Sequence, residues 1–279
     1  MSDTEVFLAL LEAKRNGQGG VLATIVHDQG SVPRHAGSKM FVRPDGSIVG
    51  TVGGGEMESR VIKQARSVHA SGVAEMSHHE LVDPSRDDPG VCGGQLDIFM
   101  EPILPNPTVL VIGCGHCGQA LADLAHWLGF RVLVSDDRAD LCNPNVIPDA
   151  DEYLVVPASE LAKTVTIHNR MYIAAVTRGV ALDTEMLPPL VDSPAPYIGV
   201  MGSRRRWANA VKKLKDRGVD VAKLKRIHAP IGMELNAETP REIAVSIMAE
   251  IIAHYRGGSG ESMKWMGSPE EADATPHAS

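Results

Sequence analysis

The segment Thr108-Val-Leu-Val-Ile-Gly113-Cys-Gly-His-Cys-Gly118 decides how the second half of this chain folds. An apolar run leads into glycines with the G-x-G-x-x-G spacing, and the helical pattern of Gln119 to Leu128 follows. Glycines in this order permit a tight turn, let the backbone approach a pyrophosphate and allow a helix to pack closely on a strand. A helix N-terminus also favours an anion. The segment therefore predicts a strand, a turn and a helix that form a dinucleotide-type pocket.

Strands and helices alternate after this segment. Apolar runs at Arg131 to Ser135, Met171 to Thr177 and Tyr197 to Val200 are predicted strands, and two later helices follow. This alternation favours an α/β fold with a Rossmann-like, doubly wound parallel sheet. Asp136 ends the second strand, 18 residues beyond Gly118, where an acid would hydrogen-bond a ribose hydroxyl. The predicted cofactor-binding residues here are Gly113, Gly115, His116, Gly118 and Asp136. The alternative is the same fold with a vestigial pocket.

Three arginines open one of the later helices. Arg204, Arg205 and Arg206 follow Gly202 and Ser203 after a predicted strand. Cations near the positive end of a helix cost about 0.3 to 1 kcal/mol each unless an anion compensates them. Ser203 and Arg204 are therefore predicted to bind a phosphate. The alternative makes the three arginines solvated or salt-bridged surface residues.

The first part of the chain is predicted to be a smaller, mixed α+β domain over residues 1–103. Its apolar spacing and its turn residues give a helix, a strand, a hairpin, a second helix and a last strand. These elements are expected at Val6 to Arg15, Val21 to Val26, Met40 to Val42 with Ser47 to Val52, Glu56 to about Ala70, and Gln95 to Glu101.

Prolines and polar residues mark the predicted domain boundaries. Residues 102–107 contain three prolines, which disfavour both a helix and a central strand. We therefore place a linker there, ahead of a Rossmann-like domain over residues 108–256. From Gly257 onward the chain is polar, without periodicity, and residues 257–279 are predicted to be a disordered tail.

Two glycine-containing loops of the first domain are candidates for anion binding. They are Gly30-Ser31-Val-Pro33-Arg34 and Gly53-Gly54-Gly55. Ser31 and Arg34 supply polar and cationic groups, and the three glycines present free backbone N–H groups. We predict that Ser31, Arg34, Gly54 and Gly55 contribute to cofactor binding.

The cysteines offer two further hypotheses. Cys92 lies in a glycine-rich loop, accessible enough to carry sulfur or to bind a soft metal, and it is the predicted metal ligand. Cys114 and Cys117 have the C-x-x-C spacing. They are either a redox or metal pair or, as we favour, small buried residues of the turn. His78 and His79 are interpreted as structural or surface histidines.

Composition limits the class of protein and its partners. Of the 279 residues 43% are apolar and 22% charged, which predicts a folded soluble protein. Lys and Arg total 27 against 35 Asp and Glu, so no general basic field attracts nucleic acid. The apolar runs are too short or too charged to span a membrane, and the N-terminus lacks the pattern of a secretory signal. With only four cysteines, the chain is predicted to be cytoplasmic.

Six motifs follow one another along most of residues 5–256. They are Gly30-Ser-Val-Pro-Arg34, Gly53-Gly-Gly55 with Glu58, Cys92-Gly-Gly94, Gly113-Cys-Gly-His-Cys-Gly118, Tyr197-Ile-Gly-Val-Met-Gly-Ser-Arg204, and Ile227-His-Ala-Pro-Ile-Gly232 through Glu238-Thr-Pro240. Together they resemble the XdhC/CoxI family, the accessory factors of molybdenum hydroxylases of the xanthine dehydrogenase and carbon monoxide dehydrogenase type. The resemblance implies a homodimer that binds molybdenum cofactor, protects it during sulfuration and delivers it to an apo-hydroxylase. A cysteine desulfurase is a further implied partner.

Two classes of function remain open. A cofactor-binding protein explains the phosphate-friendly features without a catalytic base, since molybdopterin carries a phosphate and its cytosine dinucleotide adds a pyrophosphate and a ribose. The alternative is an NAD(P)-dependent oxidoreductase that uses the same pocket. Against the enzyme, no Ser-Tyr-Lys or His-Asp catalytic set is recognisable in the sequence.

Overall fold

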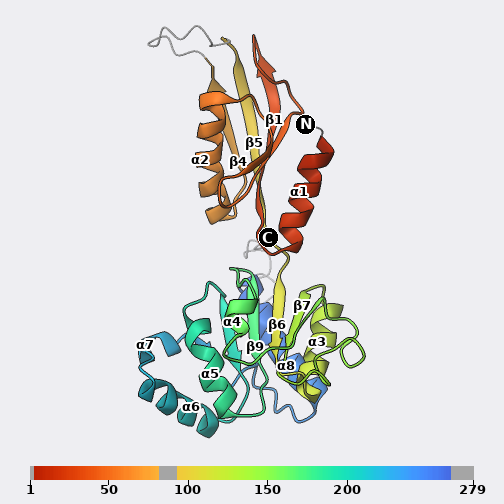
Figure 1. Ribbon diagram of the computed structural model, residues 1–279, viewed down its shortest axis with the longest axis vertical. Helices are drawn as coiled ribbons and strands as arrows, with labels where there is room; N and C mark the ends of the chain where they lie inside the picture. The colour runs from red at the N-terminus through yellow and green to blue at the C-terminus, as the bar shows by residue number, and fades with distance from the viewer. Residues whose placement is uncertain (1–2, 82–92, 265–279) are drawn as a thin grey trace, which may run out of the picture. The chain divides into compact units, whose positions relative to one another are not determined.

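The computed structural model describes residues 3–81 and 93–264 (Figure 1). Packing divides the chain into two compact units. The N-terminal unit comprises Met1–Val109, Glu160–Met171 and Ser193–Pro196, and the C-terminal unit comprises Leu110–Ser159, Tyr172–Asp192 and Tyr197–Ser279. Within the described ranges, no helix is both long and apolar enough to cross a membrane.

The N-terminal unit is built on a five-stranded antiparallel sheet with strand order β3-β2-β1-β5-β4. Its elements are α1 (Asp3–Arg15), β1 (Gly20–Gln29), β2 (Lys39–Val42), β3 (Ile48–Gly50), α2 (Gly55–Ser71), β4 (Glu75–Glu80) and β5 (Gln95–Ile103). The two helices cover opposite faces of the sheet (Figure 1). Met57, Val61, Ala65 and Val68 of α2 pack into one core, and Val6, Ala9 and Ala13 of α1 pack around Phe41 in another.

The predicted hairpin and both predicted helices of this unit are present, but β4 is not recognisable from the sequence. Its six residues are mostly polar, and only Ser77 and His79 are buried. The Oγ of Ser77 lies 2.8 Å from Nε2 of His79, and Nδ1 of the exposed His78 lies 2.7 Å from Oδ1 of Asp97 on β5. These contacts with their own sheet agree with the interpretation of both histidines as structural or surface residues.

Strand β5 runs into the proline-rich segment as far as Ile103. Pro102 is paired with Val21 of β1, whereas the pairing of β4 with β5 ends at Met100. Pro102 therefore has a partner strand on one side only, which is where a strand tolerates proline.

The C-terminal unit contains a six-stranded parallel sheet with strand order β11-β10-β9-β6-β7-β8. Its elements are β6 (Thr108–Ile112), α3 (His116–Trp127), β7 (Arg131–Ser135), β8 (Glu152–Leu154), β9 (Met171–Ala175), α5 (Val180–Val191), β10 (Tyr197–Val200), α6 (Arg204–Asp216), α7 (Val221–Leu224), β11 (Ile227–His228) and α8 (Pro240–Arg256). The short helix α4 (Leu161–Thr164), between β8 and β9 in the chain, is counted with the N-terminal unit. Read along the chain, this is the strand order 6-5-4-1-2-3 of a doubly wound dinucleotide-binding fold. The predicted α/β fold class is confirmed.

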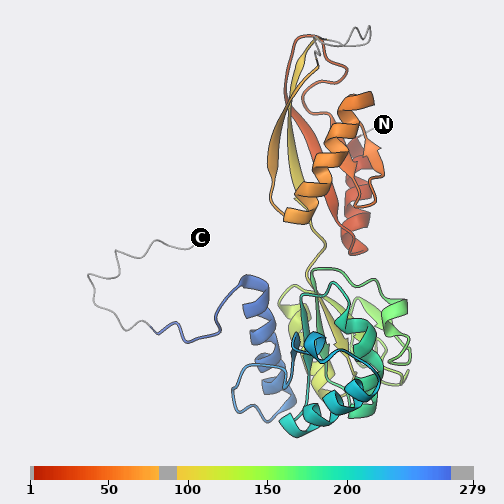
Figure 2. The ribbon, with the colours of Figure 1, turned by 90° about the vertical axis from the view of Figure 1, so that its left-hand side faces the viewer.

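Helices cover both faces of this sheet. Helices α3 and α8 pack against each other on one face, and α5 and α6 pack together on the other (Figures 1 and 2). Helix α8 begins with a capping box, in which Thr239 Oγ1 accepts from the backbone N–H of Glu242 and the Glu242 carboxylate accepts from that of Thr239. The crossover from one face to the other lies between β6 and β9, which is where such folds bind ligands.

Candidate functional site

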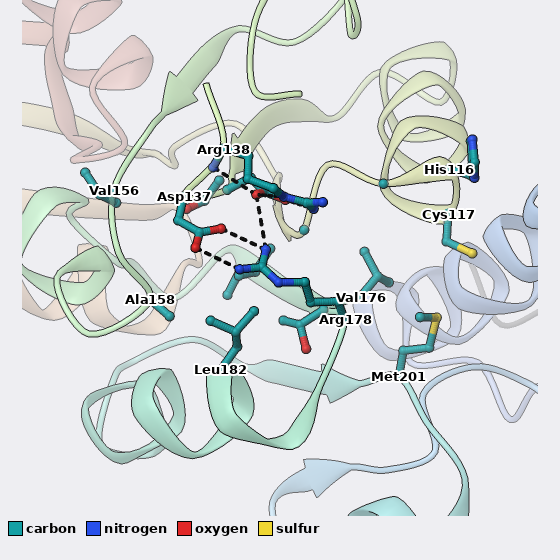
Figure 3. A pocket seen from close by; sticks show the side chains of 16 residues that line it. His116, Cys117, Asp137, Arg138, Val156, Ala158, Val176, Arg178, Leu182 and Met201 are labelled. Carbon is teal, nitrogen blue, oxygen red and sulfur yellow. Dashed lines mark hydrogen bonds and ion pairs between the residues drawn. The ribbon is translucent and has the colours of Figure 1, made fainter. Parts of the chain in front are cut away.

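A cavity of about 290 Å³ lies at the carboxyl ends of the central strands of the C-terminal unit (Figure 3). Residues that follow four neighbouring strands line it: Gly113 after β6, Asp136 after β7, Val176 after β9 and Met201 after β10. This position at the crossover of the sheet results directly from the strand order, since β6 and β9 are neighbours whose connections leave toward opposite faces. The cavity approaches the size range of small-molecule sites, about 300 to 1,000 Å³.

The three glycines of the turn after β6 have different structural roles. Gly113 has φ +112°, and a Cβ there would lie 2.7 Å from the carbonyl oxygen of Val176, so no other residue fits well. At Gly118 a Cβ would overlap the carbonyl oxygen of Gly113, which shows how closely α3 approaches the turn. Gly115 differs, because it is extended with φ −73° and a Cβ there would meet no atom within 4 Å. Gly113 and Gly118 therefore maintain the turn, whereas Gly115 leaves space beside the cavity.

The N-terminus of α3 faces this space. Gly115 is the N-cap, and no side chain caps the first turn of the helix. Uncapped N–H groups at a helix start favour an anion. Gly115, His116 and Cys117 line the cavity from this helix, and His116 is exposed. The predicted residues Gly113, Gly115, His116 and Asp136 thus line one cavity, with Gly118 packed beneath the turn.

Both carboxylate oxygens of Asp136 accept hydrogen bonds from other groups of the protein. Its side chain is only 3% exposed. Oδ2 accepts from the backbone N–H of Cys114 at 2.8 Å and from Nη2 of Arg138 at 2.9 Å, and Oδ1 accepts from the backbone N–H and Nε of Arg138 at 3.1 and 2.8 Å. Burial raises the pKa of Asp136, but these hydrogen bonds outweigh it and hold the pKa at about 2. The carboxylate therefore ties the glycine turn to the loop after β7, and the predicted contact with a ribose stays a prediction.

We expect Asp136→Asn to lower the free energy of unfolding by about 2 kcal/mol at pH 7. This is the stabilisation that corresponds to a folded-state pKa nearly two units below the unfolded value. Because the folded pKa is the lower one, this stabilisation is complete above about pH 4 and is lost as the pH falls toward 2. Urea unfolding of both proteins at several pH values measures the difference. The exposed Asp123 of α3 provides the control Asp123→Asn, expected within about 0.5 kcal/mol of wild type. A difference at Asp136 that is constant from pH 7 to pH 2 would contradict the assignment.

A second ion pair lies at the cavity. Asp137 and Arg178, both exposed, come from the loops after β7 and β9 and are joined by two hydrogen bonds of 2.9 Å (Figure 3). Nη1 of Arg178 also lies 3.8 Å from Oδ1 of Asp136. The bond from Arg178 lowers the pKa of the Asp137 carboxyl. No motif in the sequence selects Asp137, Arg138 or Arg178, although each follows a strand end of the parallel sheet.

One arginine of the run that opens α6, Arg206, is compensated from within the protein. Nε and Nη2 of Arg206 donate to Oδ2 of Asp183 at 3.1 and 2.8 Å, and Asp183 is fully buried. Arg206 also donates to the carbonyl oxygen and to Oγ1 of Thr177 at 3.1 and 2.7 Å. Ser203 Oγ accepts from the backbone N–H of Arg206 as the N-cap. Neither Ser203 nor Arg204 lines the cavity, and their binding of a phosphate stays a prediction.

The two predicted loops of the N-terminal unit lie next to each other. A Cβ on Gly53 would lie 2.9 Å from Cγ of Pro33, so the loop of Ser31 and Arg34 packs against the three glycines. Gly54 is the N-cap of α2 with φ +86° and no side-chain cap, and Gly55 has φ +62°. Ser31 and Arg34 are exposed. Cys92, the predicted metal ligand, lies outside the described residues.

The two cysteines of the glycine turn have different surroundings. Cys114 is fully buried, and its thiol is hydrogen-bonded to that of Cys142, whereas Cys117 is half-buried at the cavity. The hydrogen bond with Cys142 and burial raise the pKa of Cys114, and burial raises that of Cys117. Among the residues that the structure describes, no group of three His, Cys, Asp or Glu could hold a metal ion. The interpretation of both thiols as residues of the turn agrees with this geometry.

The C-terminal unit is a Rossmann-type domain with a cavity at the crossover of its sheet. The chain belongs to the XdhC and CoxI family: residues 109–251 match the XdhC Rossmann domain, and residues 13–80 match the XdhC and CoxI family domain.

Three curated proteins are similar to this chain in sequence. The protein YqeB of Escherichia coli K12 is 34% identical over 244 residues, which are 87% of this chain and 44% of YqeB. A protein of Bacillus subtilis 168 described as a probable xanthine dehydrogenase component is 30% identical over 156 residues, 56% of this chain and 45% of that protein. The molybdenum cofactor insertion chaperone PaoD of E. coli K12 is 23% identical and covers 86% of this chain and 85% of PaoD. The chain thus spans less than half the length of the first two relatives.

A solved structure shares the whole fold. The crystal structure of a xanthine dehydrogenase from Bacillus halodurans superposes with a TM-score of 0.50 at 22% identity, over 98% of this chain and 99% of that one. The likeness supports the arrangement of elements described above.

Proposed function

We propose that this protein binds molybdenum cofactor, protects it, supports its sulfuration and inserts it into an apo molybdenum hydroxylase of the xanthine dehydrogenase type. Membership of the XdhC and CoxI family supports the proposal, and so do the functions given for PaoD and for the B. subtilis relative. The single observation that carries it is the cavity at the crossover of the sheet, where a helix N-terminus and two arginines face one space.

The residues of the cavity suit the phosphorylated end of such a ligand. A phosphate beside Gly115 would meet the uncapped N–H groups of α3, which favour an anion. Arg138 and Arg178 add cationic side chains to the same wall. Molybdopterin has one phosphate, and its cytosine dinucleotide has a pyrophosphate and a ribose, so both forms contain a group that this wall can bind. A binding protein of this kind needs no catalytic base.

The proposal extends to partners and to further sites. The partners are the apo-hydroxylase and a cysteine desulfurase that provides sulfur, and the protein acts as a homodimer in the cytoplasm. Ser31, Arg34, Gly54 and Gly55 would contribute a second group of polar contacts to the cofactor, with Ser203 and Arg204 as further candidates. Cys92 would carry sulfur or bind the metal.

An NAD(P)-dependent oxidoreductase is the second candidate. The strand order favours it, because a doubly wound sheet of this order binds dinucleotides at the same crossover. Against it, both oxygens of Asp136 already accept hydrogen bonds from the protein, so its contact with a ribose would require some of them to break.

The deciding experiment identifies what the purified protein contains. We expect the full chain, produced in a molybdenum-replete host, to carry a pterin that becomes fluorescent after oxidation, in a fixed ratio to molybdenum. Protein from a host unable to make the cofactor is the control and should carry none. Nicotinamide is measured on the same samples. Nicotinamide in place of pterin would contradict the proposal and support the oxidoreductase.

A further inference from the structure

Two loops on either side of β6 meet at the cavity through one bidentate ion pair. Asp137 follows β7 and Arg178 follows β9, and Nη1 and Nη2 of Arg178 donate to Oδ1 and Oδ2 of Asp137, each at 2.9 Å (Figure 3). Both residues line the cavity. The guanidinium thus presents two parallel N–H groups to a planar anion inside a candidate ligand site.

The other arginine of the cavity is less free to change partner. Nε and Nη2 of Arg138 bond to Asp136, whose side chain is 3% exposed. Removing Arg138 from this contact would leave a buried carboxylate with only the more distant Arg178, at 3.8 Å, as a counter-ion, which is unfavourable. Asp137 and Arg178 are 37% and 48% exposed, so Asp137 can return to water when it is released. Ion pairs of this exposure contribute little to stability.

The charges at the cavity balance as they stand. Asp136 and Asp137 provide two negative charges, and Arg138 and Arg178 provide two positive ones. A phosphate that entered without displacing anything would meet a site of zero net charge with a carboxylate beside it. Replacing Asp137 on Arg178 would remove that repulsion and give the phosphate two charge-assisted hydrogen bonds.

We infer that Arg178 is an anion-binding residue of this cavity and that Asp137 holds it until the phosphate of a ligand takes the place of the carboxylate. The inference rests on the proposed function only in that the natural ligand carries a phosphate. Asp137 therefore competes with the ligand, and it lowers the affinity for every phosphorylated compound that reaches Arg178. No covalent bond changes in this exchange, because one oxyanion replaces another on the same guanidinium.

Inorganic pyrophosphate is the probe, measured by titration calorimetry on the full chain at low salt. We expect Asp137→Asn to bind pyrophosphate roughly 2- to 5-fold more tightly than wild type, because the competing charge is gone. Arg178→Gln should bind about 10- to 100-fold more weakly, because two charge-assisted hydrogen bonds are lost. Arg178→Lys keeps the charge without the planar fork and should recover part of the affinity. In the double variant Asp137→Asn with Arg178→Gln, the gain from Asp137→Asn should vanish.

A matched control separates this exchange from a general change of charge. Asp192 pairs with Lys223 at 2.6 Å, is exposed and does not line the cavity, so Asp192→Asn removes the same charge elsewhere and should leave the affinity unchanged. Equal affinities of wild type, Asp137→Asn and Arg178→Gln would overturn the inference. So would a gain from Asp137→Asn that persists without Arg178, or the absence of pyrophosphate binding in both wild type and Asp137→Asn.

Pterin content of the same preparations distinguishes this inference from the proposed function. Bound pterin with no difference among the variants would refute the exchange at Arg178 and leave the cofactor-binding function standing. The expected order of affinities without any pterin would refute that function and leave Arg178 as an anion-binding residue.

Discussion

Replacing Asp183 with alanine is expected to lower the free energy of unfolding by about 3 to 5 kcal/mol, the usual effect of removing one partner from a buried ion pair. Asp183 is fully buried and accepts from Nε and Nη2 of Arg206 and from Oγ1 of Thr177, the last at 2.5 Å. Without the carboxylate, the guanidinium of Arg206, 20% exposed, would lose its counter-ion next to the positive end of α6. We therefore expect the largest loss of stability here.

Urea unfolding at pH 7 measures this effect. The matched control is Arg205→Ala, which removes an exposed arginine from the same helix turn and should change stability by no more than about 1 kcal/mol, because only an unfavourable dipole contact disappears. Asp183→Asn should have an intermediate effect, since an amide oxygen can still accept one of the bonds. A loss below about 1 kcal/mol for Asp183→Ala would show that the network contributes little.

Gly115→Val is expected to weaken the binding of pyrophosphate strongly while the protein keeps its fold. Gly115 has extended backbone angles that valine can adopt, and a Cβ there meets no atom within 4 Å. The added side chain would therefore enter the space beside the N-terminus of α3 and block the contacts of a phosphate with that helix. Loss of two hydrogen bonds to a charged group corresponds to about a 100-fold or greater fall in affinity. The stability cost is that of a poorer N-cap, about 1 kcal/mol or less.

Gly118→Ala is the contrasting variant. Its Cβ would overlap the carbonyl oxygen of Gly113, so we expect it to destabilise the fold by at least the roughly 1 to 3 kcal/mol of an overpacked site. Thermal unfolding and pyrophosphate calorimetry, performed on both variants and wild type, separate the two effects. Unchanged pyrophosphate affinity in a folded Gly115→Val protein would exclude this turn as the binding site.

The sequence predicts the parts of the fold that local rules control. The glycine spacing predicts the turn after β6, and Thr239, Pro240 and Glu242 predict the start of α8, because each pattern corresponds to one backbone geometry. Strand β4 escapes prediction because its polar residues give no apolar alternation, and its stability comes from pairing with β5.

The candidate site is less predictable because its charged residues find their partners across the sheet. From the sequence, an acid at the position of Asp136 could either contact a ribose or hydrogen-bond to the glycine turn. The structure shows the second contact, because Oδ2 accepts from the backbone N–H of Cys114 at 2.8 Å. Asp137 and Arg178 stand 41 residues apart and meet because the carboxyl ends of parallel strands share one edge. In the same way, the sequence predicts a bound phosphate beside the arginines of α6. The negative charge next to Arg206 comes instead from Asp183, 23 residues earlier in the chain.

The bonds around Asp136 also determine how the turn responds to a ligand. With the Cys114 amide and Arg138 both fixed to one buried carboxylate, the loop after β6 has little conformational freedom to lose. Binding then requires little ordering of the backbone, and more of the contact energy remains as affinity. Under the proposed function, the turn would act as a rigid template, and the exposed side chains around it would adapt to different ligands.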